Sequence, residues 1–470
     1  MLRGYTFKLT VASLAALIFF DACRKREEFS LPDNYVVFAT DAQGISESEN
    51  SITVNLKLTR PTTADISVVI NIADQGAVYG THYTTTPAAT NGVLNLTLPS
   101  GNSEAAFTVN KKAGVLFEGT EKISFDLYSS GSPILIGATK HYTLSFSELV
   151  ATNSAMTVNG GGTLFPNKVF IDLSANRQTA VLRTNWDLGF YTDPNDFKVV
   201  LNSSTGMMVK QLAKNDLTQV TAADTAGLSL ELTYSSFSPS PIQLPYVDYP
   251  DGNMNKTAIG LISTTASDNK VFLVNRGTDI GSAPAPLRGW KKIRVLRNGS
   301  GGYTLQYADI AATTFSSIDI AKDDKYFFKY VSFDNGIVNI EPQKTRWDIA
   351  WCYFGYITGS PDPNLPGEVP FLYQDFVVQN RNVSIAQVLT SAKTYEAFSE
   401  ADIAGQTFST IQTTIGSTWR STYPSAAVKA DRFYIIKDGD GNYYKLKFTG
   451  MTDGGVRGYP SIAYELIKRG

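Results

Sequence analysis

Histidine is almost missing from this chain: among 470 residues there are two, His82 and His141, and none in the last 320. Because histidine is the commonest metal ligand and general base, that stretch holds neither a Ser-His-Asp triad nor a metal site built on imidazole. Gly-x-Ser-x-Gly and His-Glu-x-x-His motifs are missing too, so we expect a protein that is not an enzyme. A hydrolase that joins carboxylates distant in sequence stays open as a further class.

The chain has no net positive charge, and cysteine is scarce. The formal net charge is −2, which gives no positive field for nucleic acid, so we expect no nucleic-acid partner. The two cysteines are Cys23 and Cys352. If Cys23 has another role, no disulfide within the chain remains, and Cys352 is expected to be a small buried apolar residue.

The first residues are typical of a secretory signal. Arg3 and Lys8 flank the start of an apolar run, residues 9–20 (LTVASLAALIFF). This run is shorter than the roughly 20 residues that span a bilayer. Residues 20–23 (FDAC) resemble the lipobox of bacterial lipoproteins, although Phe20 and Asp21 depart from its usual pattern.

This resemblance predicts a signal peptide over residues 1–22 and a lipidated tether over residues 23–33, with acyl chains on Cys23. The basic and acidic run that follows, residues 24–28 (RKREE), resembles the signals that send Bacteroidetes lipoproteins to the outer face of the cell. We therefore expect the protein on the outer membrane, facing the exterior. Ordinary secretion, with Cys23 incidental, is the alternative.

Period-two alternation dominates the next segment. Residues 52–58 (ITVNLKL), 93–98 (VLNLTL), 123–127 (ISFDL) and 142–146 (YTLSF) alternate apolar and polar residues between turn-forming stretches. Aromatic residues make up 12% of the chain, which also favours β structure. The pattern predicts an antiparallel β-sandwich over residues 34–149.

Four short segments of this sandwich resemble the Calx-β family: residues 46–49 (SESE), 80–83 (GTHY), 98–101 (LPSG) and 117–121 (FEGTE). In that family, acidic residues at one end of the sandwich can bind calcium, and the comparable residues here are Glu47, Glu49, Glu118 and Glu121. The family's Asp-Asp pair is missing. Because calcium takes six to eight oxygen ligands, we favour a purely structural sandwich over a calcium site.

The remaining residues contain a long repeat. Residues 184–190 (TNWDLGF) match residues 345–351 (TRWDIAW), and residues 271–277 (VFLVNRG) match residues 433–439 (FYIIKDG). A period this long indicates two tandem copies of a domain rather than a solenoid. We expect an all-β protein with copies over residues 150–312 and 313–470, each mostly antiparallel.

These copies resemble the HmuY family of Bacteroidetes surface lipoproteins. The resemblance is carried by the Trp-Asp-(Ile/Leu)-(Ala/Gly)-aromatic motif after an aromatic strand, residues 325–330 (KYFFKY), and by the strand pair over residues 433–448. It implies haem capture at the cell surface and transfer to an outer-membrane receptor. The family founder holds haem iron through two histidines, which this region lacks, and some relatives are thought to use methionine.

The resemblance therefore makes methionines and aromatic residues on loops the candidates for haem binding. Met254 and Tyr249 lie on an expected loop, and Met207 and Met208 follow a turn. A thioether can serve as an axial iron ligand, and an aromatic ring can stack on a porphyrin or a sugar. Ordinary packing is the alternative for each of them.

The two Trp-Asp pairs have a simpler explanation. We expect Trp186 and Trp347 to be buried and Asp187 and Asp348 to accept backbone or indole hydrogen bonds, as a structural motif. The sequence thus predicts a non-enzymatic surface lipoprotein that binds haem or another porphyrin. The alternative is a surface adhesion or glycan-binding lipoprotein with no haem activity, because a fold does not determine a function.

Overall fold

The structure is a computed structural model that describes residues 32–45, 49–112, 121–146, 153–228, 230, 241–282, 284–360, 363–364 and 366–470. These residues form β-strands and short 3-10 helices and no α-helix, so the predicted all-β class is confirmed. The 3-10 helices are η2 (Ser203–Thr205), η3 (Leu217–Gln219), η4 (Ala222–Thr225), η5 (Pro241–Tyr246), η6 (Met254–Lys256), η7 (Ala266–Asp268) and η8 (Glu400–Gly405).

The first ten strands build a β-sandwich whose sheets have the orders β5-β7-β3-β1-β9 and β2-β10-β8-β4-β6. In β3 every second residue is buried, from Ile52 to Leu58, as the alternation predicted. Most neighbours are antiparallel, but β1 pairs with β9 and β2 with β10 in parallel. The strands are β1 (Asn34–Phe38), β2 (Ala42–Gly44), β3 (Ser51–Leu58), β4 (Ile66–Gln75), β5 (Tyr83–Thr86), β6 (Val93–Leu98), β7 (Glu104–Lys111), β8 (Lys122–Ser130), β9 (Ile134–Ile136) and β10 (His141–Ser145).

The other strands form four larger sheets and a ribbon of β26 and β27. The four orders are β16-β17-β18-β19-β20, β11-β30-β29-β28-β25, β15-β14-β21-β22 and β13-β12-β23-β24. The strands up to β20 are β11 (Asn153–Thr157), β12 (Asn167–Asp172), β13 (Arg177–Leu182), β14 (Leu188–Tyr191), β15 (Val199–Leu201), β16 (Met208–Gln211), β17 (Phe272–Asn275), β18 (Trp290–Arg297), β19 (Tyr303–Asp309) and β20 (Ser316–Ile320). The later strands are β21 (Phe328–Ser332), β22 (Gly336–Val338), β23 (Ile349–Gly359), β24 (Glu368–Gln379), β25 (Ser384–Leu389), β26 (Arg420–Ser421), β27 (Ala427–Val428), β28 (Arg432–Lys437), β29 (Tyr443–Asp453) and β30 (Val456–Lys468).

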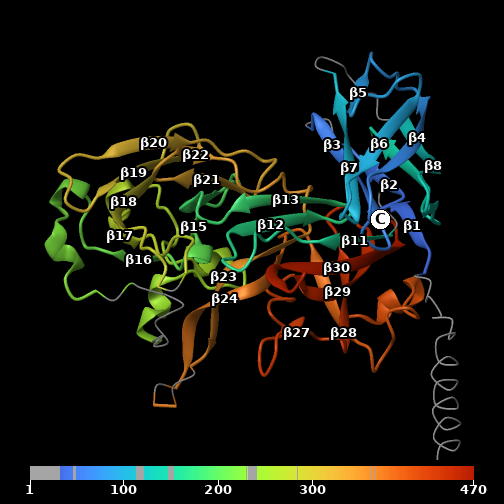
Figure 1. Ribbon diagram of the computed structural model, residues 1–470. Coiled ribbons are helices and arrows are strands. Elements are labelled where there is room, and N and C mark those ends of the chain that lie inside the picture. The colour runs from blue at the N-terminus through green and yellow to red at the C-terminus, as the bar shows by residue number, and fades with distance from the viewer. Residues whose placement is uncertain are drawn as a thin grey trace, which may run out of the picture.

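Each of the four larger sheets contains strands from both expected copies. β11 pairs with β30, β12 with β23, β14 with β21 and β19 with β20. Figure 1 shows β12 lying beside β23, although they are far apart in the sequence. The backbone donors and acceptors of one copy are thus satisfied by the other. This corrects the expected tandem arrangement, because residue 312 does not divide two separately folded units.

The repeat is nevertheless visible in the strand order. The spatial order β20-β19-β18-β17-β16 matches β11-β30-β29-β28-β25, and β22-β21-β14-β15 matches β13-β12-β23-β24. We call strands β14–β22 the first half and strands β11–β13 together with β23–β30 the second half. The first half is continuous in the sequence and is inserted between β13 and β23 of the second half, and each sheet lies within one half.

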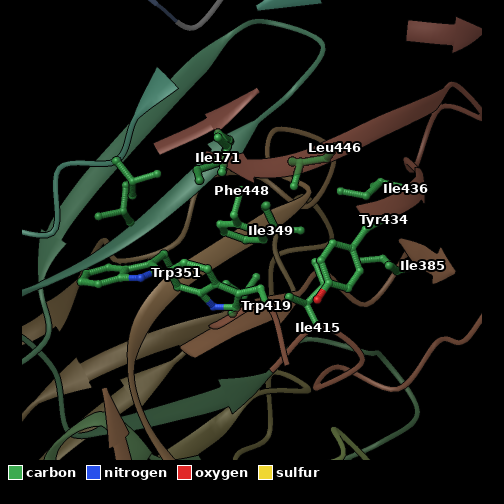
Figure 2. Close-up of a cluster of buried hydrophobic side chains, with 14 of the residues drawn as sticks. Ile171, Ile349, Trp351, Ile385, Ile415, Trp419, Tyr434, Ile436, Leu446 and Phe448 are labelled. Carbon is green, nitrogen blue, oxygen red and sulfur yellow. The ribbon is translucent and has the colours of Figure 1, made fainter. Parts of the chain in front are cut away.

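Each half has its own apolar core. The core of the first half gathers side chains between Leu188 and Phe333. The core of the second half is shown in Figure 2, where Trp351, Trp419 and Phe448 lie close together and Trp419 stacks on Phe448 at 4.2 Å between ring centroids. A third cluster, which includes Phe170, Trp186, Trp347 and Phe376, joins the halves. A site between the halves is therefore built on packed side chains from both.

Candidate ligand cavity between the two halves

A cavity of about 120 Å³ opens where the two halves meet. The first half contributes Trp186, just before β14, and Phe328 on β21. The second half contributes Trp347, just before β23, and Phe354 on β23. Aromatic side chains from both halves therefore line the cavity, and the same position of the repeat, the tryptophan of the Trp-Asp pair, contributes to it twice.

Two buried asparagines hold these tryptophans in place. Asn202 Nδ2 donates to the carbonyl oxygens of Arg183 and Trp186, at 2.7 and 2.8 Å. Asn380 Nδ2 donates in the same way to Lys344 and Trp347, at 2.8 and 2.7 Å. We call each such pair of bonds an asparagine clamp. The clamps give the tryptophan loops of the two halves the same local geometry.

The carboxylates of the Trp-Asp pairs lie outside the cavity lining. Asp187 accepts from Arg276 Nε and Nη2 at 2.9 and 3.0 Å and from the backbone N–H of Phe333 at 2.8 Å. Asp348 accepts from the backbone N–H of Leu173 at 2.7 Å. Both carboxylates thus bond to protein groups, in line with the structural role expected of them.

The surroundings of the two aspartates nevertheless differ in charge. In the repeat, the place of Arg276 in the first half is taken by Asp438 in the second half. Burial, followed by the charges of Asp172 and Asp438, raises the pKa of Asp348 well above its usual range.

Two of the four residues that the sequence nominated for haem come together at the cavity. Tyr249 and half-buried Met254, at the start of η6, both line it. Their loop is fastened by Asp248, which accepts from the backbone N–H of Leu201 at 2.7 Å and of Ala258 at 2.8 Å. Burial raises the pKa of Asp248 to about 6.

The other two nominated residues lie elsewhere. Met207 is 1% exposed in the core of the first half, and Met208 is fully buried against the core of the second half. Neither lines the cavity. Both follow a turn, as read from the sequence, but they belong to the tightly packed interior around β16, so neither is placed to contact a ligand in the cavity.

Charged side chains complete the cavity wall. Glu341 Oε1 accepts from the backbone N–H groups of Phe327 and Phe328 at 3.0 and 2.8 Å, and its Oε2 accepts from Tyr330 Oη at 3.0 Å. Burial raises the pKa of Glu341 to about 7. Two cationic side chains, Lys168 and Arg381, also line the cavity.

Arg381 is the most enclosed of these cations, and burial lowers the pKa of its guanidinium. It donates to the carbonyl oxygen of Gly252 at 2.8 Å and lies over the ring of Phe328, 5.1 Å from its centroid. It thereby joins the second half to the loop that carries Met254 and to β21, both in the first half.

Sequence reasoning missed Arg381, Glu341 and the clamp asparagines. A signal for the clamps exists, since each half has an asparagine after its Trp-Asp pair. The separation is 16 residues from Trp186 to Asn202 and 33 from Trp347 to Asn380, so one repeat offset does not align them.

Most of the residues on which the calcium and membrane expectations rest lie outside the described residues. Glu47 and Glu118 lie outside them, and Glu49 forms an ion pair with Arg177 of β13. No group of three or more His, Cys, Asp or Glu side chains suited to a metal ion occurs among the residues described.

No helix in the described part is long and apolar enough to cross a membrane. Cys23 and residues 1–22 lie outside the described residues, and Cys352 is fully buried.

Fold and cavity together define an all-β protein in which one half is inserted into the other, with a cavity between them. The HmuY protein family matches residues 165–464, so the chain belongs to the HmuY family, as the sequence motifs predicted. One match spans both halves. No curated protein matches the chain.

Several solved structures are similar at low identity. A two-domain protein of unknown function from Bacteroides fragilis is 12% identical, with 65% of this chain and 85% of that chain covered and a TM-score of 0.20. A putative carbohydrate binding protein from Bacteroides ovatus is 10% identical, with 92% and 98% covered and a TM-score of 0.18. The calcium-binding domain CBD1 of Calx is 17% identical, with 24% and 95% covered and a TM-score of 0.21. These likenesses add nothing to the strand pairing described above.

Proposed function

We propose that this protein is a non-enzymatic ligand-binding protein of the bacterial cell surface and that it captures haem or a related porphyrin at the cavity between its halves. One observation carries the proposal: Met254 and Tyr249, which were nominated from the sequence, meet at one aromatic cavity. Thioether and phenolate groups are both known axial ligands of haem iron. Membership of the HmuY family supports the same ligand.

The cavity limits how haem can be held. Pockets that enclose drug-sized ligands measure roughly 300–1,000 Å³. At about 120 Å³ this cavity is too small to enclose a porphyrin macrocycle. The macrocycle would therefore rest at the mouth, against the aromatic side chains and Met254, with only a substituent inside.

A hemin titration followed by absorbance tests this function. Binding at Met254 predicts a saturable, shifted Soret band. A featureless titration up to high hemin concentration contradicts haem capture. Bovine serum albumin, run in parallel, shows that the hemin preparation itself is able to bind.

The location of the protein is part of the proposal. We infer that Cys23 carries acyl chains that hold the protein on the outer membrane, where an outer-membrane receptor would accept the haem. Cys23→Ala is expected to abolish incorporation of radiolabelled palmitate and to move the protein from the membrane fraction into the medium. Unchanged labelling of Cys23→Ala would contradict the anchor.

Glycan binding is the second candidate, and the size of the cavity favours it. A space of about 120 Å³ with amide side chains such as Asn253 and Gln412 in an aromatic wall suits a small hydroxyl-rich group. Quenching of tryptophan fluorescence by neutral sugars, without any Soret shift, would select this function over haem capture.

A further inference from the structure

Three buried hydrogen-bond donors on the wall of the cavity have no acceptor. Among the described residues, Trp186 Nε1, Trp347 Nε1 and Arg381 Nε are buried atoms without a hydrogen-bond partner. All three residues line the cavity, and each tryptophan is 5% exposed. Buried donors are nearly always satisfied in native proteins, so three unsatisfied donors around one cavity require an explanation. A ligand that brings acceptors would supply it.

The repeat explains why these residues lie together. Trp186 and Trp347 occupy equivalent places in the two halves, and each is held by its own asparagine clamp. Each half therefore contributes to the cavity lining one tryptophan whose indole N–H has no partner. Arg381 is the residue after the clamp residue Asn380, and its backbone N–H donates to Asn380 Oδ1 at 2.8 Å. The second clamp therefore also holds the backbone of Arg381.

The charges indicate the sign of the ligand. Arg381 and Lys168 both line the cavity. The nearby acids Glu341 and Asp248 act on Arg381 through their charges, but their oxygens accept hydrogen bonds from backbone N–H groups and from Tyr330. Both cations can therefore still contact an anion in the cavity.

The same acids limit the charge of that anion. Glu341 and Asp248 stand in the cavity wall, so a doubly charged group such as phosphate would be repelled whenever they ionise. A singly charged, planar group with two acceptor oxygens meets the donors with a smaller repulsion from these acids.

We propose that the cavity is a carboxylate-binding site in which the indole N–H groups of Trp186 and Trp347 and the guanidinium of Arg381 hold one carboxylate of the ligand. The inference deepens the proposed function, because a porphyrin at the mouth would place a propionate inside. The same site would also bind the carboxylate of a free acid, such as an acidic sugar.

The test compares ligands that differ only in their carboxylates. The purified full-length protein is titrated with iron-free mesoporphyrin IX and with its dimethyl ester, followed by porphyrin fluorescence. We expect the diacid to bind at least about tenfold more tightly, as loss of hydrogen bonds to a charged group implies. Glucuronate, glucose and inorganic phosphate are titrated separately by tryptophan fluorescence.

Variants locate the site. Trp186→Phe, Trp347→Phe and Arg381→Gln are each expected to lower diacid affinity at least about tenfold. Trp351→Phe is the matched control, because Trp351 is also buried with an unpartnered Nε1 but lies outside the cavity. Its affinity is expected to stay unchanged, while circular dichroism confirms that all four variants are folded.

Each outcome decides between the two proposals. Equal binding of diacid and diester overturns the carboxylate site but leaves porphyrin capture standing. Glucuronate binding that depends on Trp347, without porphyrin or glucose binding, supports the carboxylate site and removes porphyrin capture. Phosphate binding as tight as that of the carboxylates overturns the inference, and no binding by any of these ligands overturns both.

Discussion

Two methionines in this protein have opposite surroundings. Met254 is half-buried at the cavity, whereas Met208 is fully buried in β16. The same chemical group is therefore available to a ligand in one place and serves packing in the other. Substituting each of them in turn distinguishes an effect on hemin binding from an effect on the free energy of unfolding.

Met254→Ala is expected to lose the hemin-induced Soret shift and to change the free energy of unfolding little. Met208→Ala is expected to lower that free energy by about 2–5 kcal/mol, because it leaves a cavity in a packed core, and to keep the Soret shift. Hemin titration and urea unfolding of both variants measure the two effects. A Soret shift that survives in Met254→Ala would show that another residue holds the iron.

Glu341 makes the stability of the fold depend on pH. Its folded-state pKa is about 7, raised from 4.5 by burial. As pH rises between these values, the unfolded chain releases the proton and the folded chain retains it, so stability falls. The contribution is fully present below about pH 4.5 and is lost as pH rises through about 7, with a magnitude on the order of 3 kcal/mol.

Glu341→Gln is expected to remove this slope, because a neutral amide keeps the acceptor for Phe327 and Phe328 and does not titrate. Urea unfolding at pH 4.5, 6 and 8 measures the difference between variant and parent at each pH. Other buried acids, such as Asp348, act equally on both proteins. A difference independent of pH would mean that Glu341 does not titrate in this range.

At the scale of elements, the asparagine clamps connect strand ends to the cavity. Each clamp bonds two backbone carbonyl oxygens beside a tryptophan, so it determines where the indole lies. Strand β24 ends at Gln379, and the clamp residue Asn380 follows at once. The end of one strand thereby positions the loop that leads into β23.

Asn380→Ala is expected to lower the free energy of unfolding by about 2 kcal/mol, since two buried carbonyl oxygens lose their donor. It should also weaken ligand binding, because Trp347 is no longer held. Asn382→Ala is the matched control, since exposed Asn382 also donates to Lys344 O, at 3.0 Å. Equal effects of the two substitutions on unfolding by urea would contradict the clamp.

At the scale of the whole molecule, the second half is built from two segments that lie on either side of the first half in the sequence. Strand β11 pairs with β30 and β12 with β23, and both partners lie beyond residue 312. Without these partners their backbone groups stay unpaired, and the aromatic cluster between the halves is lost.

Residues 150–312 alone are therefore expected not to fold, whereas residues 150–470 should unfold in a single cooperative transition. Circular dichroism and urea unfolding of the two fragments check this. A cooperative transition in the fragment 150–312 would show that the first copy is an independent domain after all.

Much of the local structure could be predicted from particular residues. The alternation from Ile52 to Leu58 predicted a strand with one buried face, because side chains of a strand alternate between its faces. The pairs Trp186-Asp187 and Trp347-Asp348 revealed the repeat and the family. Tyr249 and Met254 were found because turn-forming residues indicated a loop.

The sequence by itself thus determined the class of fold, the repeat, the lack of histidine and the family resemblance, since these depend on composition and on neighbouring residues. Only the tertiary structure decided that β12 pairs with β23 and that Trp186, Trp347 and Arg381 surround one cavity. The reason is physical: strand pairing is settled by contacts between residues far apart in the chain, and period-two alternation suits many partners equally.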